Sequence, residues 1–396
     1  MSAEIASTIE FQMSLLLFVA LAGYLVASRI NQSAVIGEIL VGIIVGPSIL
    51  GLITYTDFVR SLAALGAVIL LFVIGLEFDL RDILDLRYAV IGLFGVIVPW
   101  IGGYWLTAAL GYGFESAVFV GTAMTATSIA ITANVLREMG KLDTGVARAI
   151  IGTAVIDDVL SLMALSMTID VVAGTFTPLS VTAVVMKDVV FIVLAGFAGI
   201  KIVAPLLEWI DRTPFSRKYP EFLFITAMMF AFLYALGAEA VGISAIIGAF
   251  IAGVSFHGVN IVNSRDLKEG AEYLHVIFAS IFFVSLGILA DFSALTPDIL
   301  VLLTALTVMA VITKIVGCGI PARFMGIGWQ DSLILGFGMV PRGEVAMIVA
   351  LIGLNLNLID QGIYLAIVLM SLLTTVVTPI VYRNWLYRGE RIGETA

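Results

Sequence analysis

Two adjacent aspartates, Asp157 and Asp158, are the residues whose placing most strongly suggests chemistry. They lie eleven and twelve residues into an apolar run at 146–172, which at 1.5 Å per residue is about 17 Å along a helix. Lys314 lies nine residues before Arg323 in another apolar run, about 13 Å deep by the same rise. If these runs cross a bilayer, an ionisable side chain at such a depth costs at least ~2.5–3.5 kcal/mol and marks a functional site by default.

The three charges explain one another. Two adjacent carboxylates do not both stay ionised and unpaired at low dielectric, so one is expected to take a cationic partner and the other a proton or a metal ion. Neighbours on a helix point about 100° apart, so one aspartate can face Lys314 while the other faces a cavity. Hard cations take oxygen ligands, and a carboxylate that also titrates places such an ion in competition with H⁺.

Two apolar runs contain stretches that oppose a continuous helix. Gly336–Glu344 holds a proline and three glycines, and Thr122–Ser128 is rich in hydroxyls that compete for backbone hydrogen bonds. Unwound backbone inside a membrane is tolerated only where it lines a cavity, so both runs are predicted to be broken helices beside an ion site. The hydroxyls could instead bond one helix to another. Arg342 and Glu344 are predicted to form a structural pair that offsets the partial charges of the half-helix ends.

The composition places these residues in a membrane protein. Of 396 residues, 61% are hydrophobic and 12% are charged, against about 45–50% and 25% in soluble domains. A soluble enzyme is therefore excluded, and the net charge of −9 argues against a nucleic-acid partner. Apolar runs of spanning length predict an all-α polytopic membrane protein with thirteen spans at 9–29, 33–51, 59–77, 88–110, 115–136, 146–172, 181–209, 219–238, 241–257, 271–290, 297–322, 330–355 and 361–383.

The basic residues orient these spans. Fifteen of the twenty lysines and arginines fall in loops after odd-numbered spans or in the tail, and Arg60 lies on the opposite side. The positive-inside rule then places the N-terminus outside and the short tail at 386–396 in the cytoplasm.

The sequence also contains an internal repeat. Three motifs recur at offsets of 211 to 215 residues: Val35–Gly42 as Ile246–Gly253, Gly75 with Asp79 as Gly287 with Asp291, and Gly121 with Met124 as Gly336 with Met339. Spans 2–6 are therefore predicted to repeat as spans 9–13. Because the copies lie seven spans apart, they enter the membrane from opposite sides, which is typical of secondary transporters.

Other polar residues are weaker candidates. Glu38 and Glu77 lie near the cytoplasmic ends of spans 2 and 3, where they would either line a cation funnel or be solvated at the interface. His257 and His275 lie at or near span ends, where a histidine can sense pH but is more often structural. Cys318, the single cysteine, is predicted to be a packing residue.

The motifs together resemble a known family. The NapA-type sodium/proton antiporters, of the second monovalent cation:proton antiporter family, are similar at Val155–Asp158, Ala126–Ser128, Thr313–Lys314 and Pro341–Glu344. Val35–Glu38 with Gly46–Ser48, and Leu71–Glu77, resemble that family's repeat elements. The similarity runs in order from about residue 30 to 380 without a large gap.

The resemblance implies a fold and an assembly. It predicts a homodimer of thirteen-span protomers in which two broken helices cross and a core domain moves as an elevator. The expected parts are a dimerisation domain at 1–87 and 210–296, a linker helix at 181–209, and an ion-transporting core domain at 88–180 and 297–385.

The resemblance also assigns roles. Asp158 resembles the aspartate that binds the cation or the proton, Asp157 resembles the one that pairs with Lys314, and Thr127 and Ser128 resemble residues that help to coordinate the ion. A Na⁺ ion is thus expected at Asp158, Thr127 and Ser128. The implied protein is an antiporter rather than an enzyme. It would exchange Na⁺ or Li⁺ for H⁺ electrogenically, serve pH homeostasis and need no cofactor. Its place would be the plasma membrane, and its partners lipid, monovalent cations and a second copy of the chain.

Three alternatives remain open. The first is potassium/proton exchange. Related glutathione-gated potassium systems usually have Gln where Asp157 stands and carry a soluble nucleotide-binding tail. Neither feature occurs in this sequence. An intramembrane aspartyl protease needs its two aspartates on two helices, whereas Asp157 and Asp158 are neighbours. A cation channel needs a continuous pore but no titrating carboxylate.

Overall fold

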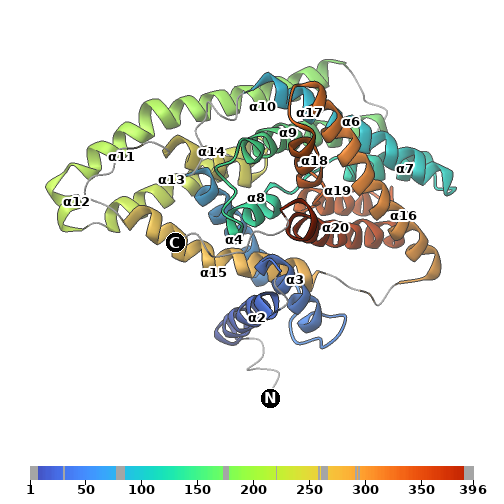
Figure 1. The fold of residues 1–396 in the computed structure, drawn as a ribbon, viewed down its shortest axis with the longest axis horizontal. Helices are drawn as coiled ribbons and strands as arrows, with labels where there is room; N and C mark the ends of the chain where they lie inside the picture. Colours follow the sequence, from blue (N-terminus) through green and yellow to red (C-terminus); the bar gives the residue numbers. More distant parts are fainter. Residues whose placement is uncertain are drawn as a thin grey trace. The chain divides into compact units, whose positions relative to one another are not determined.

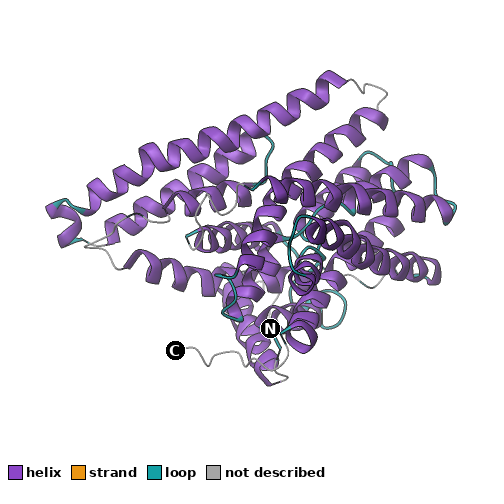
Figure 2. Ribbon diagram, turned by 45° about the horizontal axis from the view of Figure 1, so that its top comes forward, coloured by secondary structure: helices purple, strands orange, loops and turns teal. Residues whose placement is uncertain are grey.

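The computed structural model describes residues 8–29, 32–76, 85–172, 178–219, 221–256, 259, 266–289, 292 and 295–387. Within these ranges the regular structure is entirely helical (Figure 2). Helices suit an apolar sequence in lipid because each one satisfies its own backbone hydrogen bonds.

The helices follow one another along the chain in the order labelled in Figure 1. They are α2 Ile9–Arg29, α3 Ala34–Val45, α4 Asp57–Gly75, α6 Leu86–Ala109, α7 Phe114–Ala123, α8 Ile129–Glu138, α9 Gly145–Val172, α10 Pro178–Ala198, α11 Ala204–Asp211, α12 Pro214–Lys218, α13 Glu221–Ala240, α14 Ala245–Phe256, α15 Asp266–Ile288, α16 Pro297–Lys314, α17 Ile320–Phe324, α18 Trp329–Gly338, α19 Glu344–Asn355 and α20 Gln361–Val381. Three short π-helical turns interrupt or extend them: η1 Gly199–Val203, η2 Ile315–Gly319 and η3 Tyr382–Leu386.

Nine helices in the described residues are long and apolar enough to cross a membrane. Four more apolar helices are shorter, at Ala34–Val45, Phe114–Ala123, Ala245–Phe256 and Val345–Leu354. The predicted all-α polytopic membrane fold is confirmed, while the count of thirteen crossings stays a prediction.

The second predicted span is shorter than expected. It was predicted over 33–51, but α3 ends at Val45 and Gly46 is already extended, with φ −69° and ψ −177°. The residue before a proline is pushed out of the helical region, and Pro47 therefore ends this helix early.

Both predicted breaks are present. The fifth predicted span is divided into α7 and α8, with Met124–Ser128 between them, and the twelfth into α18 and α19, with Met339–Gly343 between them. The second break contains Pro341, whose ring opposes a continuous helix. The first break contains no proline or glycine; its residues are Met124, Ala126 and three residues with hydroxyl side chains.

Packing contacts divide the chain into two compact units. Unit 1 comprises Met1–Ala20, Tyr55–Asp82 and Val185–Ser285, and unit 2 comprises Leu21–Thr54, Ile83–Val184 and Leu286–Ala396. Both broken helices, α9 and α16 lie in unit 2. The helix α3 also belongs to unit 2, although the resemblance groups it with the dimerisation domain.

Glycines of the repeat pack in matching pairs. In unit 1, a Cβ on Gly75 would lie 3.0 Å from Cα of Gly253, and in unit 2 a Cβ on Gly287 would lie 2.9 Å from the carbonyl carbon of Gly42. Because Gly75 recurs as Gly287 and Gly42 as Gly253, each copy of one helix packs on a copy of the other. Small residues permit this close approach of helices.

Candidate ion-binding site

The central contact of unit 2 is an ion pair between α9 and α16. Lys314 Nζ lies 2.7 Å from Asp157 Oδ1, and both side chains are 0% exposed. The sequence placed Lys314 well inside an apolar run and expected one of the two aspartates to face it, and the pair has this arrangement. A fully buried pair is stable only with close geometry, which this short contact supplies.

The helix α6 provides room for the pair. A Cβ on Gly95 would lie 2.7 Å from Cys318 Sγ, 3.3 Å from Asp157 Oδ1 and 3.8 Å from Lys314 Nζ. The π-helical turn η2 directly follows Lys314 and carries Cys318, which is buried as predicted. Pro99, one turn beyond Gly95, has no N–H to donate to the Gly95 carbonyl, so the usual backbone hydrogen bond of α6 is missing at this level.

Asp158 follows on the same helix and is 5% exposed. Since successive helical residues point about 100° apart, the Asp158 side chain points away from the direction in which Asp157 meets Lys314. The helix α9, which carries Asp158, packs against α6, α7, α8 and α18, so it contacts helices from both breaks.

The two breaks are bonded to each other. The Ser128 N–H donates to the Pro341 carbonyl at 2.8 Å, and the Thr127 hydroxyl donates to the Met339 carbonyl at 3.3 Å. One turn into α8, the Thr132 hydroxyl donates to the Gly338 carbonyl at 2.6 Å. The hydroxyls of the first break thus hold the second one, which is the interhelical role that the sequence left open for this cluster.

Ser128 retains an oxygen for another partner. Its Oγ is buried and has no hydrogen-bond partner among the described residues. Buried hydroxyls are normally paired, and the predicted role of Ser128 as an ion ligand would supply the missing partner. A Cβ on Gly343 would lie 2.7 Å from this oxygen, so the glycine of the second break keeps the space around it open.

Arg342 fills the crossing of the breaks. Its side chain is 0% exposed, and Nη1 donates to the carbonyls of Ala126 at 2.6 Å and Thr125 at 3.4 Å. These carbonyls follow the C-terminal end of α7, where the helix carries partial negative charge. Arg342 therefore offsets a half-helix end as predicted. The side chain of Glu344 lies outside the described part, so its pairing with Arg342 stays a prediction.

Other sequence candidates are distributed over both units. Glu38 on α3 is buried at 3% exposure, and His275 on α15 is buried at 7%. Glu77 and His257 lie outside the described residues. Sequence reasoning missed Glu138, which ends α8 and contacts α3. Glu138 lies just beyond a predicted span, where a charged residue is ordinary and does not indicate a functional role.

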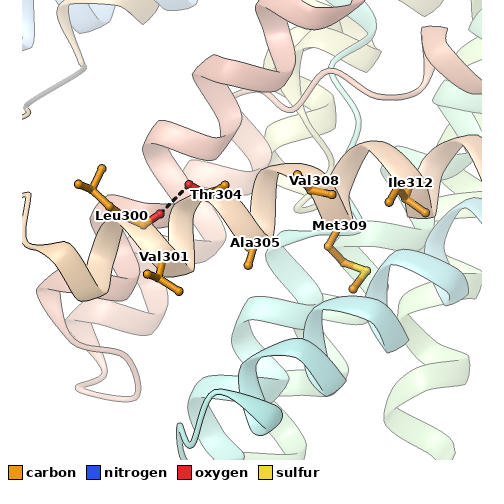
Figure 3. Close-up of a pocket in the computed structure, with 7 residues that line it drawn as sticks. All are labelled: Leu300, Val301, Thr304, Ala305, Val308, Met309 and Ile312. Atoms are coloured by element: carbon orange, nitrogen blue, oxygen red, sulfur yellow. Dashed lines mark hydrogen bonds between the residues drawn. The ribbon is translucent and has the colours of Figure 1, made fainter.

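The described residues contain no cluster of three or more histidine, cysteine, aspartate or glutamate side chains that could hold a metal ion. An apolar groove of about 660 Å³ lies elsewhere, along α16 between Leu300 and Ile312 (Figure 3). Thr304 carries the one polar side chain among the residues that line this groove, so the groove lacks the several oxygen ligands that a hard cation takes.

Comparison with known proteins identifies the family. The family model described as "Sodium/hydrogen exchanger, transmembrane" matches residues 15–386. The chain is 36% identical over 375 residues to the Na(+)/H(+)-K(+) antiporter GerN of Bacillus cereus, covering 93% of this chain and 94% of the relative. It is 31% identical over 375 residues to a Na(+)/H(+) antiporter of Enterococcus hirae, covering 93% and 96%.

A solved structure has the same fold. The sodium proton antiporter MjNhaP1 from Methanocaldococcus jannaschii at pH 8 superposes with a TM-score of 0.71 at 16% identity, covering 100% of both chains. The chain belongs to the sodium/hydrogen exchanger family, and it is a multi-pass membrane antiporter that exchanges a cation for protons. The resemblance to sodium/proton antiporters is confirmed.

Proposed function

We propose that this chain exchanges Na⁺ for H⁺ at Asp158, with Thr127 and Ser128 as further ligands. One observation carries the proposal: the buried pair of Asp157 and Lys314 at 2.7 Å. Because Lys314 neutralises Asp157, the adjacent carboxyl is left to bind either a proton or a cation. The unpartnered Ser128 Oγ beside the second break supports an oxygen-lined site.

We infer further that two protons exchange for one Na⁺. A cation at Asp158 would stand within a few ångströms of Lys314, and like charges ~5 Å apart repel by roughly 3 kcal/mol at an effective dielectric of ~20. Arg342 is also near enough to act on both members of the pair electrostatically. Cation entry would then expel the Asp158 proton and one from Lys314, so transport would move net charge.

Potassium is the second candidate cation. The name of the Bacillus cereus relative includes K⁺ beside Na⁺ and H⁺, and oxygen ligands of this kind accept either ion. The Asp at position 157 supports Na⁺, because related glutathione-gated potassium systems usually carry Gln there.

We propose that the protein works in the plasma membrane as a homodimer with its N-terminus outside. In this proposal spans 1–3 and 8–10 form the dimerisation domain, while spans 4–6 and 11–13 move between the two sides as an elevator. The two broken helices would travel with the ion because their backbones are bonded to each other.

The experiment uses purified protein in proteoliposomes with an imposed pH gradient, assayed with Na⁺, Li⁺ and K⁺ in turn. Asp158→Asn should abolish exchange while the protein still folds, whereas Asp298→Asn, an exposed carboxyl in the first turn of α16, should leave it unchanged. Substantial Na⁺-driven proton movement by Asp158→Asn would refute the assignment.

Voltage tests the stoichiometry in the same vesicles. With K⁺ and valinomycin setting the potential, the rate of Na⁺ exchange should respond to voltage. A rate and end-point that ignore voltage would mean one-for-one coupling, and Asp157 with Lys314 would then be a structural bridge.

A further inference from the structure

Glu138, the last residue of α8, joins that helix to the start of α3 within unit 2. The Ala34 N–H donates to Glu138 Oε2 at 3.2 Å, and Asn134 Nδ2 donates to Glu138 Oε1 at 3.0 Å. Both carboxylate oxygens are therefore engaged, one with α3 and one with the preceding turn of α8.

The bond to Ala34 fills a gap in α3. Ser33 stands at the N-cap of α3 but makes no side-chain capping bond to that helix. The first N–H groups of a helix have no intrahelical partner and carry partial positive charge. Glu138 thus supplies from another helix the cap that α3 lacks, and an ionised carboxylate makes a stronger cap than a neutral one.

The surroundings of Glu138 make its charge sensitive to pH. Burial raises the pKa of Glu138 above its ordinary value, while the polar groups of Ser33, Ala34 and Asn134 and the charge of Arg383 act in the opposite direction. Arg383, on η3, is the charged group on a neighbouring element that acts on this carboxyl among the described residues. Glu138 lies just beyond the predicted span 115–136, at the end of α8 that the predicted topology places on the cytoplasmic side, so its proton would come from that side.

We propose that Glu138 is a positioning residue whose ionised form latches α8 to α3 and whose protonation releases it. The latch matters for transport because α8 begins directly after Ser128, so holding the far end of α8 also holds the broken helix of the ion site. The proposal rests on the proposed function in one respect, the movement of the core domain relative to α3. Packing in this structure does place α3 in the same unit as α8, as a closed latch would.

The direction of the pH effect follows from the raised pKa. Above the pKa of Glu138 the carboxylate is ionised, the cap is complete and α8 is held. As pH falls through that pKa the cap weakens and the helices separate more readily. Release of the latch should therefore make the wild-type turnover rate increase as the pH falls through the pKa of Glu138.

The test measures tracer exchange with equal pH on both sides of the proteoliposomes, so that no proton gradient drives transport. The tracer is ²²Na⁺, or ⁸⁶Rb⁺ if the wild type exchanges that ion instead, at a saturating cation concentration. Glu138→Gln cannot ionise. Its turnover relative to wild type should be close to one at low pH and rise to roughly three- to tenfold at high pH, since hydrogen bonds to charged groups are the stronger ones. Glu115→Gln, an exposed glutamate in the first turn of α7, should keep a ratio of one at every pH.

A second variant tests the proton itself. Asn134→Ala keeps Glu138 but removes a donor that favours its ionised form, so the midpoint of the pH component should move upward by about half a unit to one unit. A Glu138→Gln profile that parallels the wild type, or an Asn134→Ala midpoint that does not move, overturns the latch. Cation exchange by the wild type in the same vesicles tests the proposed function separately.

Discussion

Replacing Gly95 by alanine would introduce a single methyl group beside the ion pair of unit 2. The new Cβ would lie 2.7 Å from Cys318 Sγ and 3.3 Å from Asp157 Oδ1, and real Cβ atoms essentially never come within 3.0 Å of a neighbour. Overpacking of this kind typically costs ~1–3 kcal/mol. The sulfur, the carboxylate or the backbone of α6 must shift, and a shift of the carboxylate would disturb its 2.7 Å contact with Lys314. Gly95→Ala should therefore lower both thermal stability in detergent and the rate of exchange.

The structure supplies a rescue and a control for this variant. Cys318→Ala removes the sulfur that the new methyl would strike, so the double variant should regain most of what Gly95→Ala loses, measured against Cys318→Ala alone. Gly145→Ala places a methyl where no atom lies within 4 Å, and it should leave stability and exchange near wild type. Two results would show that the pair is not confined by α6 as described: a Gly95→Ala protein as stable and active as wild type, or a double variant no better than the single one.

Three other predictions concern the same unit and the topology. Lys314→Ala leaves Asp157 buried without its partner, so the protein should lose ~3–5 kcal/mol of stability and unfold at a lower temperature in detergent. Adding Asp157→Asn should restore part of that loss. Equal stability of the single and double variants would contradict the pairing. Arg342→Lys keeps the charge but not the reach of Nη1 to two carbonyls, so it should lower stability less than Arg342→Gln does, and the reverse order in a thermal shift assay would be evidence against the role given to the charge. Single cysteines near Lys141 or Lys218, in a Cys318→Ala background, should be labelled only from the cytoplasmic side of intact cells, and labelling of both from outside would invert the topology.

Much of unit 2 was predictable because membrane burial makes polar residues informative. Depth along an apolar run identified Asp157, Asp158 and Lys314, since charged side chains at mid-depth are too costly to be accidental. The proline of the second break and the hydroxyls of the first located both interruptions to within a few residues. Charge balance predicted that one of the two aspartates takes a cationic partner, and the resemblance assigned Asp157 to Lys314; in the structure Lys314 Nζ lies 2.7 Å from Asp157 Oδ1.

Features that depend on three-dimensional proximity could not be read from the sequence. The role of Gly95 depends on Cys318 and Asp157 meeting it from two other helices, which no local pattern reveals. Glu138 was overlooked because a glutamate next to a basic loop resembles ordinary interfacial charge, and its contact with Ala34 joins residues 104 positions apart. The early end of α3 follows from one local rule, the restriction that Pro47 places on the residue before it. The span was predicted from hydropathy alone, which does not take this restriction into account.

Charge balance connects the ion pair to the exchange that we propose. Among the described side chains at the centre of unit 2, Asp157 and Asp158 carry negative charge and Lys314 and Arg342 carry positive charge, so the four sum to zero when all are ionised. A proton or a monovalent cation at Asp158 would add the same single charge, which would let the two compete for one carboxyl as we propose. They differ in position, because a proton is covalently held on one oxygen whereas a cation is shared among several ligands and stands nearer to Lys314. If that difference is large enough to expel a lysine proton, the cation-bound form is neutral and the protonated form is positive. Voltage dependence of exchange would therefore show that Lys314 releases a proton during transport.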